Sequence, residues 1–155
     1  MNNPRETIEV ALFDLLKDYV QQNYQSYEFV PEFVDFSRQY RPVEKDSSDQ
    51  QPVLYLVKGP EHVDQDDVFG PSRFKLHYAV VIFLQLDPMS KHPLPQTVLN
   101  NILQMVEDSL FNRGDAQTLG RLVTNAWIEG DIEIRLPIVK SQAALVIPVS
   151  ILTGS

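Results

Sequence analysis

The sequence predicts an α+β fold: a mostly antiparallel sheet of about five strands with two main helices packed on one face. Apolar residues recur at helical spacing in two segments, one near the start of the chain and one near residue 103. Alternating or continuous apolar runs, typical of strands, lie between and after these segments. A length of 155 residues fits one domain, so we expect residues 1–155 to form a single unit with its own core.

Both helices have start signals. Asn3 can cap the first helix with Pro4 in its first turn, and Pro95 occupies the same kind of position in the second. Gly114 is a suitable residue just beyond the end of the second helix. Each helix has one apolar stripe with polar residues opposite, so each should pack one side on the sheet.

Two strands are expected in the middle of the chain. The first, Pro52–Lys58, should stop at Gly59-Pro60. The second, Phe74–Leu86, has apolar residues on both faces at its middle, which is typical of a central strand. Its length predicts that it extends beyond the core or bends at a bulge. Polar segments 41–51 and 59–72 are predicted to be mobile loops, and 41–51 could instead be an extended hairpin tip that orders only against a partner.

The last third of the chain predicts a three-stranded meander. Segments Val123–Glu129 and Asp131–Leu136 flank Gly130, which indicates a hairpin with Trp127, Ile132 and Ile134 on one face. The last segment, Gln142–Leu152, is apolar on both sides. It contains Pro148, which cannot donate to a ladder, so this strand is expected at a sheet edge or a bulge. An apolar edge strand could pair with a neighbouring chain.

Six aromatic residues are concentrated in residues 24–40, where Pro31 argues against one continuous helix. These side chains could close the core or form a patch that another subunit covers, and the core is the favoured interpretation. The residues that we expect at a subunit or partner interface come from this segment, from the following polar loop and from the last strand: Phe33, Phe36, Tyr40, Arg41, Glu44, Lys45, Val146 and Pro148.

Composition and motifs indicate no catalytic site and no cofactor. The formal net charge of −8 argues against binding to a phosphate backbone, and the absence of cysteine excludes disulfides and thiolate chemistry. Phosphate-binding glycine motifs and the G-x-S-x-G motif are absent, and the three histidines lie in separate segments. His77 and Trp127 are interpreted as structural residues, with a partner contact as the alternative for Trp127.

The acidic loop is the one candidate metal site. Glu61, His62, Asp64, Asp66 and Asp67 could offer ligands to Ca²⁺ or Mg²⁺. Their spacing does not fit a calcium-binding loop, so a solvated acidic loop is the favoured interpretation and we predict no metal site. A small metal-dependent hydrolase that uses this loop is the alternative from another functional class.

Three phrases, VLNNILQMVEDSLF, QTLGRLVTNAWIEGDIEI and QAALVIPVSIL, together with the order of elements, resemble the tail terminator proteins of long-tailed bacteriophages and prophages. The resemblance covers about residues 52–153 and implies no enzymatic activity. It implies a virion subunit that forms a ring, expected to be a hexamer, on the head-proximal end of the tail tube. Such a ring stops tube polymerisation and presents the surface to which the head docks.

The implied partners are further copies of the chain, the tail tube protein and a head-completion or neck protein, with DNA passing through the lumen without specific binding. Assembly would take place in the host cytoplasm, and no membrane association is expected because the apolar runs are much shorter than about 18 residues. A head–tail joining protein is the alternative within the same class. A cytosolic adaptor without a role in the virion is the alternative from a third functional class.

Overall fold

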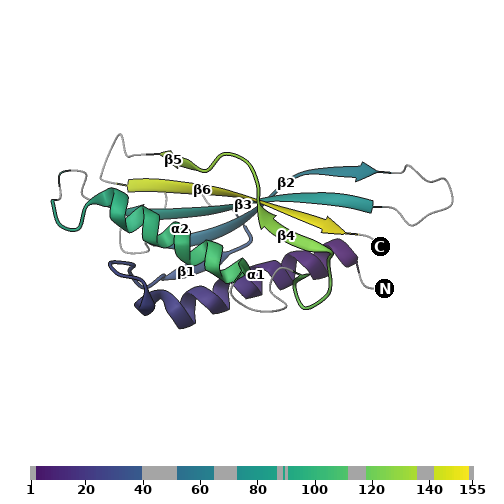
Figure 1. Cartoon of the computed structure of the whole chain (residues 1–155), viewed down its shortest axis with the longest axis horizontal. Helices are drawn as coiled ribbons and strands as arrows, with labels where there is room; N and C mark the ends of the chain where they lie inside the picture. The colour runs from purple at the N-terminus through teal and green to yellow at the C-terminus, as the bar shows by residue number, and fades with distance from the viewer. Residues whose placement is uncertain are drawn as a thin grey trace.

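The computed structural model describes residues 3–39, 52–64, 73–86, 89, 91–111, 118–135 and 142–153. Two helices lie on one face of a six-stranded, mostly antiparallel sheet (Figure 1), which confirms the predicted α+β class. The strand order is β1-β2-β3-β6-β4, and β5 also pairs with β6. The elements are α1 (Pro4–Asn23), the 3-10 helix η1 (Tyr24–Ser26), β1 (Asp35–Ser37), β2 (Val53–Asp64), β3 (Arg73–Gln85), α2 (Pro95–Phe111), β4 (Asn125–Ile128), β5 (Glu133–Arg135) and β6 (Gln142–Thr153).

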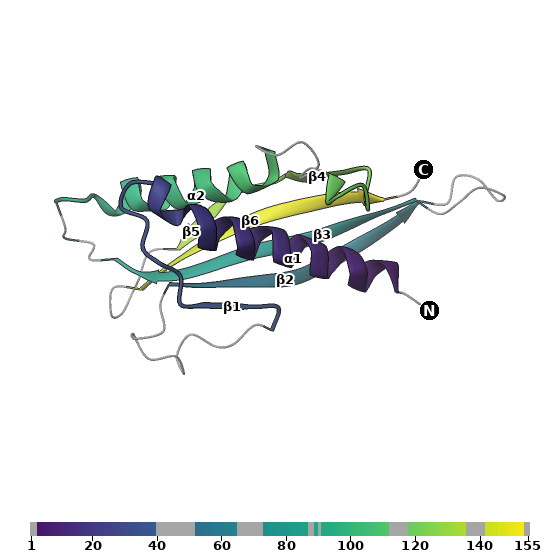
Figure 2. The same ribbon diagram turned by 90° about the horizontal axis from the view of Figure 1, so that it is seen from below.

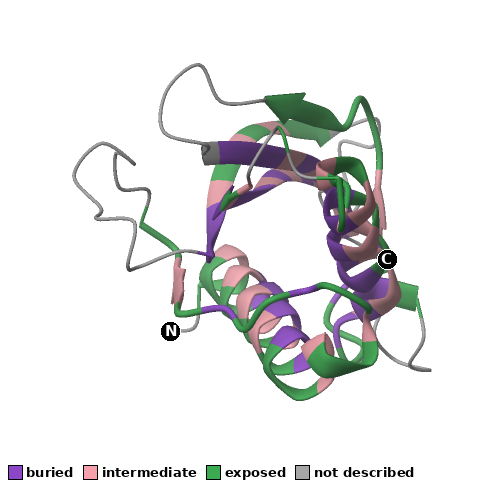
Figure 3. Ribbon diagram, turned by 90° about the vertical axis from the view of Figure 1, so that its left-hand side faces the viewer, coloured by how far each residue is buried: buried purple, intermediate pink, exposed green. Residues whose placement is uncertain are grey.

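Both helices begin where the sequence predicts. The side chain of Asn3 accepts a hydrogen bond from the backbone N–H of Arg5 at 3.0 Å, which satisfies one of the free donors of the first turn. Figure 2 shows α1 and α2 side by side on the same face of the sheet. Their apolar stripes form the core together with the strands, and Figure 3 shows the buried stretches on the sides of these elements that face one another.

Strand β3 is the centre of the sheet, as predicted. It pairs antiparallel with β2 on one side and with β6 on the other. Side chains of even-numbered β3 residues point toward the helices, and their neighbours in β2 and β6 do the same. The fully buried residues on this face include Leu54, Leu76, Val80, Ile82, Leu145, Ile147 and Ile151.

Strand β2 is longer than predicted, because it continues through Gly59-Pro60 instead of stopping there. A register shift against β3 lies between Lys58 and Glu61, so the strand takes up the proline at a bulge. Residues 59–64, expected to belong to a loop, therefore extend the strand. The distal part of β2, residues 59–64, and its partner in β3, residues 73–77, extend past α2 alongside the first turns of α1 (Figure 1) and are called the arm below.

The predicted hairpin at Gly130 is wrong. Strands β4 and β5 do not pair with each other; both pair antiparallel with β6, one after the other along the same side. Ile128 pairs with Val149 and Glu133 pairs with Val146. Between these two pairs, the four residues 129–132 lie opposite only two residues of β6, 147 and 148. Pro148 is one of those two, and its missing N–H explains why the ladder is interrupted there.

Strand β6 is therefore an internal strand, and the expected apolar edge strand is not found. The other part of that prediction is confirmed, since Pro148 lies opposite a bulge, where its carbonyl accepts a hydrogen bond from the N–H of Glu129 at 3.2 Å. The predicted common face of Trp127 and Ile134 is also wrong. Trp127 pairs with Ser150 on the face away from the helices, whereas Ile134 pairs with Leu145 on the helix face.

Candidate assembly surfaces

The two sides of the sheet end in very short strands. Strand β1 pairs in parallel with β2, and β5 pairs antiparallel with β6; each contributes three residues. Within the described ranges, no strand pairs with the outer edge of either one. Apolar side chains are exposed at both edges: Val34 before β1 at 53%, Ile132 before β5 at 38% and Ile134 within β5 at 46%. Unpaired edges with exposed apolar residues can pair with another chain.

The predicted interface residues that the structure describes lie in two separate places. Phe33 is buried in the core and its ring stacks on that of Phe36 in β1, with centroids 5.9 Å apart. Val146 and Pro148 lie in β6 on the face away from the helices, and β2 and β3 separate them from β1. The other four residues lie outside the described residues: Tyr40, Arg41, Glu44 and Lys45.

The sheet face away from the helices has its own apolar cluster. Val53, Tyr55 and Val81 are buried there, and Val57, Ala79, Phe83 and Val146 pack around them half-buried. Neither α1 nor α2 covers this face (Figure 2). The rings of Tyr55 and Phe83 meet edge to face with centroids 5.9 Å apart. The three central residues are at most 9% exposed, so this cluster is a second, smaller core, and only the half-buried residues around it are accessible to another chain.

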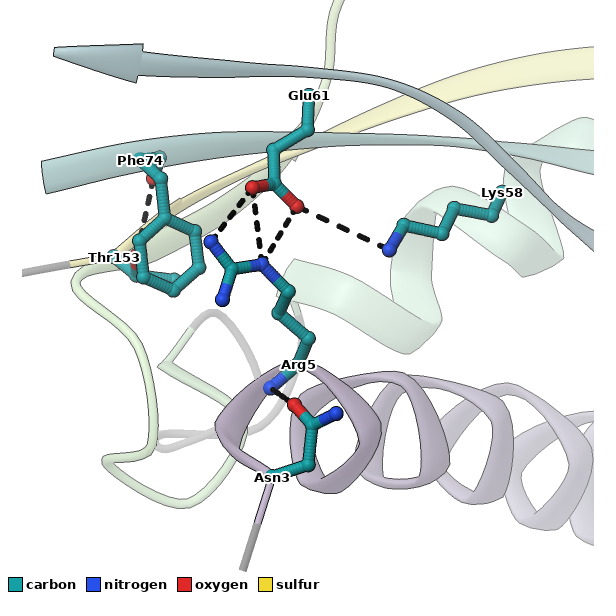
Figure 4. Close-up of polar contacts among 6 residues, drawn as sticks. All are labelled: Asn3, Arg5, Lys58, Glu61, Phe74 and Thr153. Atoms are coloured by element: carbon teal, nitrogen blue, oxygen red, sulfur yellow. Dashed lines mark hydrogen bonds and ion pairs between the residues drawn. The ribbon is translucent and has the colours of Figure 1, made fainter.

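The arm is tied to the start of α1 by Arg5. Its guanidinium donates to both carboxylate oxygens of Glu61, with the shortest N–O distance 2.7 Å, and lies 4.4 Å from the centroid of the Phe74 ring (Figure 4). Glu61 belongs to β2 and Phe74 to β3, so one side chain contacts both strands of the arm. Lys58 Nζ lies 3.9 Å from Glu61 as well. A bidentate contact of this kind fixes direction as well as distance.

The pKa of Glu61 is lowered, chiefly by its hydrogen bonds to Arg5. A carboxylate whose folded pKa lies below its unfolded value stabilises the folded state above the unfolded pKa of about 4.3, and this contribution is lost as the pH falls through the folded pKa. We therefore expect amide hydrogen exchange in the arm, corrected for intrinsic rates, to rise as the pH falls below about 4. In Glu61→Gln the arm should exchange faster at neutral pH and lose the part of this pH dependence that comes from Glu61. Unchanged exchange in Glu61→Gln would contradict the role of the contact.

A second contact joins the arm to Glu129, the residue after β4. Lys75 Nζ lies 2.9 Å from a carboxylate oxygen of Glu129 and 5.3 Å from the centroid of the Trp127 ring. The hydrogen bond from Lys75 is the largest cause of the lowered pKa of Glu129. Trp127 is half-buried and lies on the sheet face away from the helices, so it is not the core residue that its size suggests.

Two of the residues considered for chemistry, Glu61 and His77, are engaged in structural contacts. Glu61 binds Arg5, and His77 Nδ1 lies 3.2 Å from Ser150 Oγ across the β3–β6 ladder. Elsewhere, Asp108 of α2 accepts a hydrogen bond from the Tyr27 hydroxyl at 2.6 Å. The pKa of Tyr27 is raised chiefly by burial and secondly by this hydrogen bond. Among the residues that the structure describes, no group of three or more ligating side chains could hold a metal ion; Asp66 and Asp67 lie outside them.

None of the helices in the described parts of the chain is long and apolar enough to cross a membrane. No known protein family matches the sequence, and no curated protein matches it. Among solved structures, the fold is similar to that of a chain from the virion of a native gene transfer agent particle. The TM-score is 0.51 and the sequence identity 13%, and the match covers 93% of this chain and 92% of that chain. The likeness shows that the two chains share a fold over nearly their whole lengths.

Sequence reasoning missed the two strand edges and the arm contact. Strand β1 lies in the aromatic segment, where three residues give too short a pattern to recognise as a strand. Arg5 and Glu61 are 56 positions apart in the sequence, so no local spacing relates them. The bulge at Pro148 was detectable, because a proline in an internal strand requires an interruption of the neighbouring ladder.

Proposed function

We propose that this chain is a structural subunit of a virion, and specifically a tail terminator. In this role, copies of the chain form a ring on the head-proximal end of the tail tube, stop its polymerisation and present the surface to which the head docks. The observation that carries the proposal is the shared fold with a virion chain, since it extends over 93% of this chain and 92% of that one. A match of this extent concerns the whole domain and not an isolated motif.

The surfaces of the chain support a role in assembly. A ring requires a heterologous interface, in which one patch of a subunit binds a different patch of the next. The sheet has two different edges on opposite sides, one formed by β1 and the other by β4 and β5. The net charge of −8 is compatible with a lumen through which DNA moves without being held.

A head–tail joining protein is the second candidate. The shared fold supports it as well, because it relates this chain to a virion and not to one position within a virion. Both candidates are structural, and they predict different particles when the protein is absent.

We expect particles assembled without this protein to have over-long tails, since nothing would stop tube growth. Electron microscopy of particles from cells that lack the gene, with the gene restored in trans as the control, would measure tail length and head attachment. Tails of normal length without heads would indicate the joining protein instead. Normal, complete particles would contradict a structural role in the virion.

A further inference from the structure

The strands β1 and β5 occupy the same three rungs of the sheet. Following the ladder partners across it, Asp35 is aligned with Val53, Phe83, Ala144 and finally Arg135. In the same way, Phe36 is aligned with Ile134 through residues 54, 82 and 145. Ser37 is aligned with Glu133 through residues 55, 81 and 146. The two edges therefore lie at one level along the strand direction, on opposite sides of the sheet.

This alignment matters because a closed ring has no rise from one copy to the next. When copies are joined by a rotation about an axis parallel to the strands, without translation, each edge meets the neighbour's edge at the same level. The strands alternate in direction so that β1 runs with β2 and against β3, and β5 runs with β3. In copies that all point the same way, β5 of one copy and β1 of the next are therefore antiparallel, which is the commoner strand pairing.

The side chains of the two edges also match in face and charge. Phe36 pairs with Leu54 and Ile134 with Leu145, so both point to the helix face. Asp35 and Arg135 belong to the other face, where an antiparallel contact would place them opposite each other. Arg135 now forms an ion pair with Glu133 at 3.0 Å in which both side chains are more than half exposed. An exposed pair of this kind holds little energy, so Arg135 is available to a neighbour.

We propose that neighbouring copies join edge to edge, with β1 of one copy pairing antiparallel with β5 of the next. Asp35 then lies opposite Arg135, Phe36 opposite Ile134 and Ser37 opposite Glu133, and the sheet continues from copy to copy with all helices on one side. The inference rests on the proposed function and names the seam of its ring. Three rungs bury less than the roughly 1,200–2,000 Å² of a stable interface, so the pairing sets the register and adjoining surfaces add area.

A two-fold contact between two β5 strands is the competing arrangement. With Ile134 opposite Ile134, each Glu133 would face an Arg135, so the charges also match there. That contact involves one edge, gives dimers and leaves β1 unused. The two arrangements therefore differ in whether Asp35 matters.

The test is a charge exchange across the seam. We expect Asp35→Arg and Arg135→Asp each to place like charges opposite each other and to raise the apparent dissociation constant of assembly about tenfold. The double variant restores the opposite pair in every interface and should assemble to within about threefold of the unchanged protein. Light scattering and analytical ultracentrifugation would measure assembly, alone and with tail tube subunits, and circular dichroism would verify folding.

Mixing the two single variants gives a second readout. In a ring of Asp35→Arg copies alone, the introduced arginine faces the unchanged Arg135 of the next copy. When the next copy is instead the Arg135→Asp variant, the introduced arginine faces an introduced aspartate, so the mixture should assemble better than either variant alone. Asp14→Arg on α1 and Arg121→Asp in a turn make the same charge changes at positions away from both edges and should leave assembly unchanged.

The outcomes separate this inference from the proposed function. Rings that form equally well with either single variant would overturn the edge pairing while leaving the virion role in place. Loss of assembly in Arg135→Asp that Asp35→Arg does not rescue would indicate the two-fold contact and overturn the heterologous seam. An unchanged protein that stays monomeric even with tail tube subunits would contradict both proposals.

Discussion

Replacing Ile82 with alanine should lower the free energy of unfolding by about 2–5 kcal/mol. Ile82 lies in the middle of β3 with no exposed surface, and its ladder partners Leu54 and Leu145 are fully buried too. These three side chains form one rung under the helices. Removing the branched end of the middle one leaves a cavity that two hydrogen-bonded neighbours cannot close, because their backbones are held on both sides.

Urea unfolding followed by circular dichroism would measure this loss at a protein concentration that keeps the chain monomeric. The matched control is Ile132→Ala, the same change at a side chain that is 38% exposed, where a shift within about 0.5 kcal/mol is expected. Equal losses at the two positions would contradict the central place of β3 in the core. A larger loss for Ile82 also supports the ladder alignment from which the edge pairing is inferred.

Strand β3 shows why the fold class could be predicted from the sequence. Its even-numbered positions are apolar throughout, and its odd-numbered positions are apolar only in the middle. This pattern predicts a strand that is covered on both faces at its middle and exposed to solvent on one face at its ends. The helices are equally informative, since Asn3 and the two prolines fix their starts and the apolar stripes give one buried side each. Local chemistry and periodicity agree at these elements.

The connections of the last three strands could not be predicted in the same way. Gly130 between two apolar segments is a good hairpin signal, but here its φ of +113° serves a bulge that lies directly against Pro148 of the neighbouring strand β6. Whether β4 pairs with β5 or with β6 depends on which contact buries more apolar surface in the folded sheet. That choice is tertiary, and the residues near Gly130 do not encode it.

The position of the sheet edges could not be predicted from the sequence. An apolar strand with a proline suggests an edge, which is the reason for expecting Val146 and Pro148 at an interface, whereas β4 and β5 cover that side of β6. The residues that lie at the edges, Asp35 and Arg135, are ordinary charged residues in short segments. The two residues are related because they lie on one rung that crosses five strands. No short window of the sequence contains all five strands.

Replacing Gly130 with alanine should cost about 1–3 kcal/mol of stability. Its φ of +113° is a conformation that residues with a side chain rarely adopt. A Cβ there would also lie 3.3 Å from Cγ of Pro148, which is tighter than an ordinary van der Waals contact. Strain and contact act together, because the bulge places Gly130 directly against the proline ring.

Two further variants separate these causes. Gly120→Ala is the matched control, since Gly120 also has a positive φ, of +68°, but an added Cβ would meet no described atom within 4 Å, so the change should cost about 1 kcal/mol from conformation alone. In a Pro148→Ala background the Cγ atom is gone, and the cost of Gly130→Ala should fall toward that of Gly120→Ala. Urea unfolding of the four proteins of this double-mutant cycle gives the coupling between residues 130 and 148. A coupling near zero would mean that the bulge does not hold these residues in contact, and it would remove the physical reason for treating β4 and β5 as one interrupted edge.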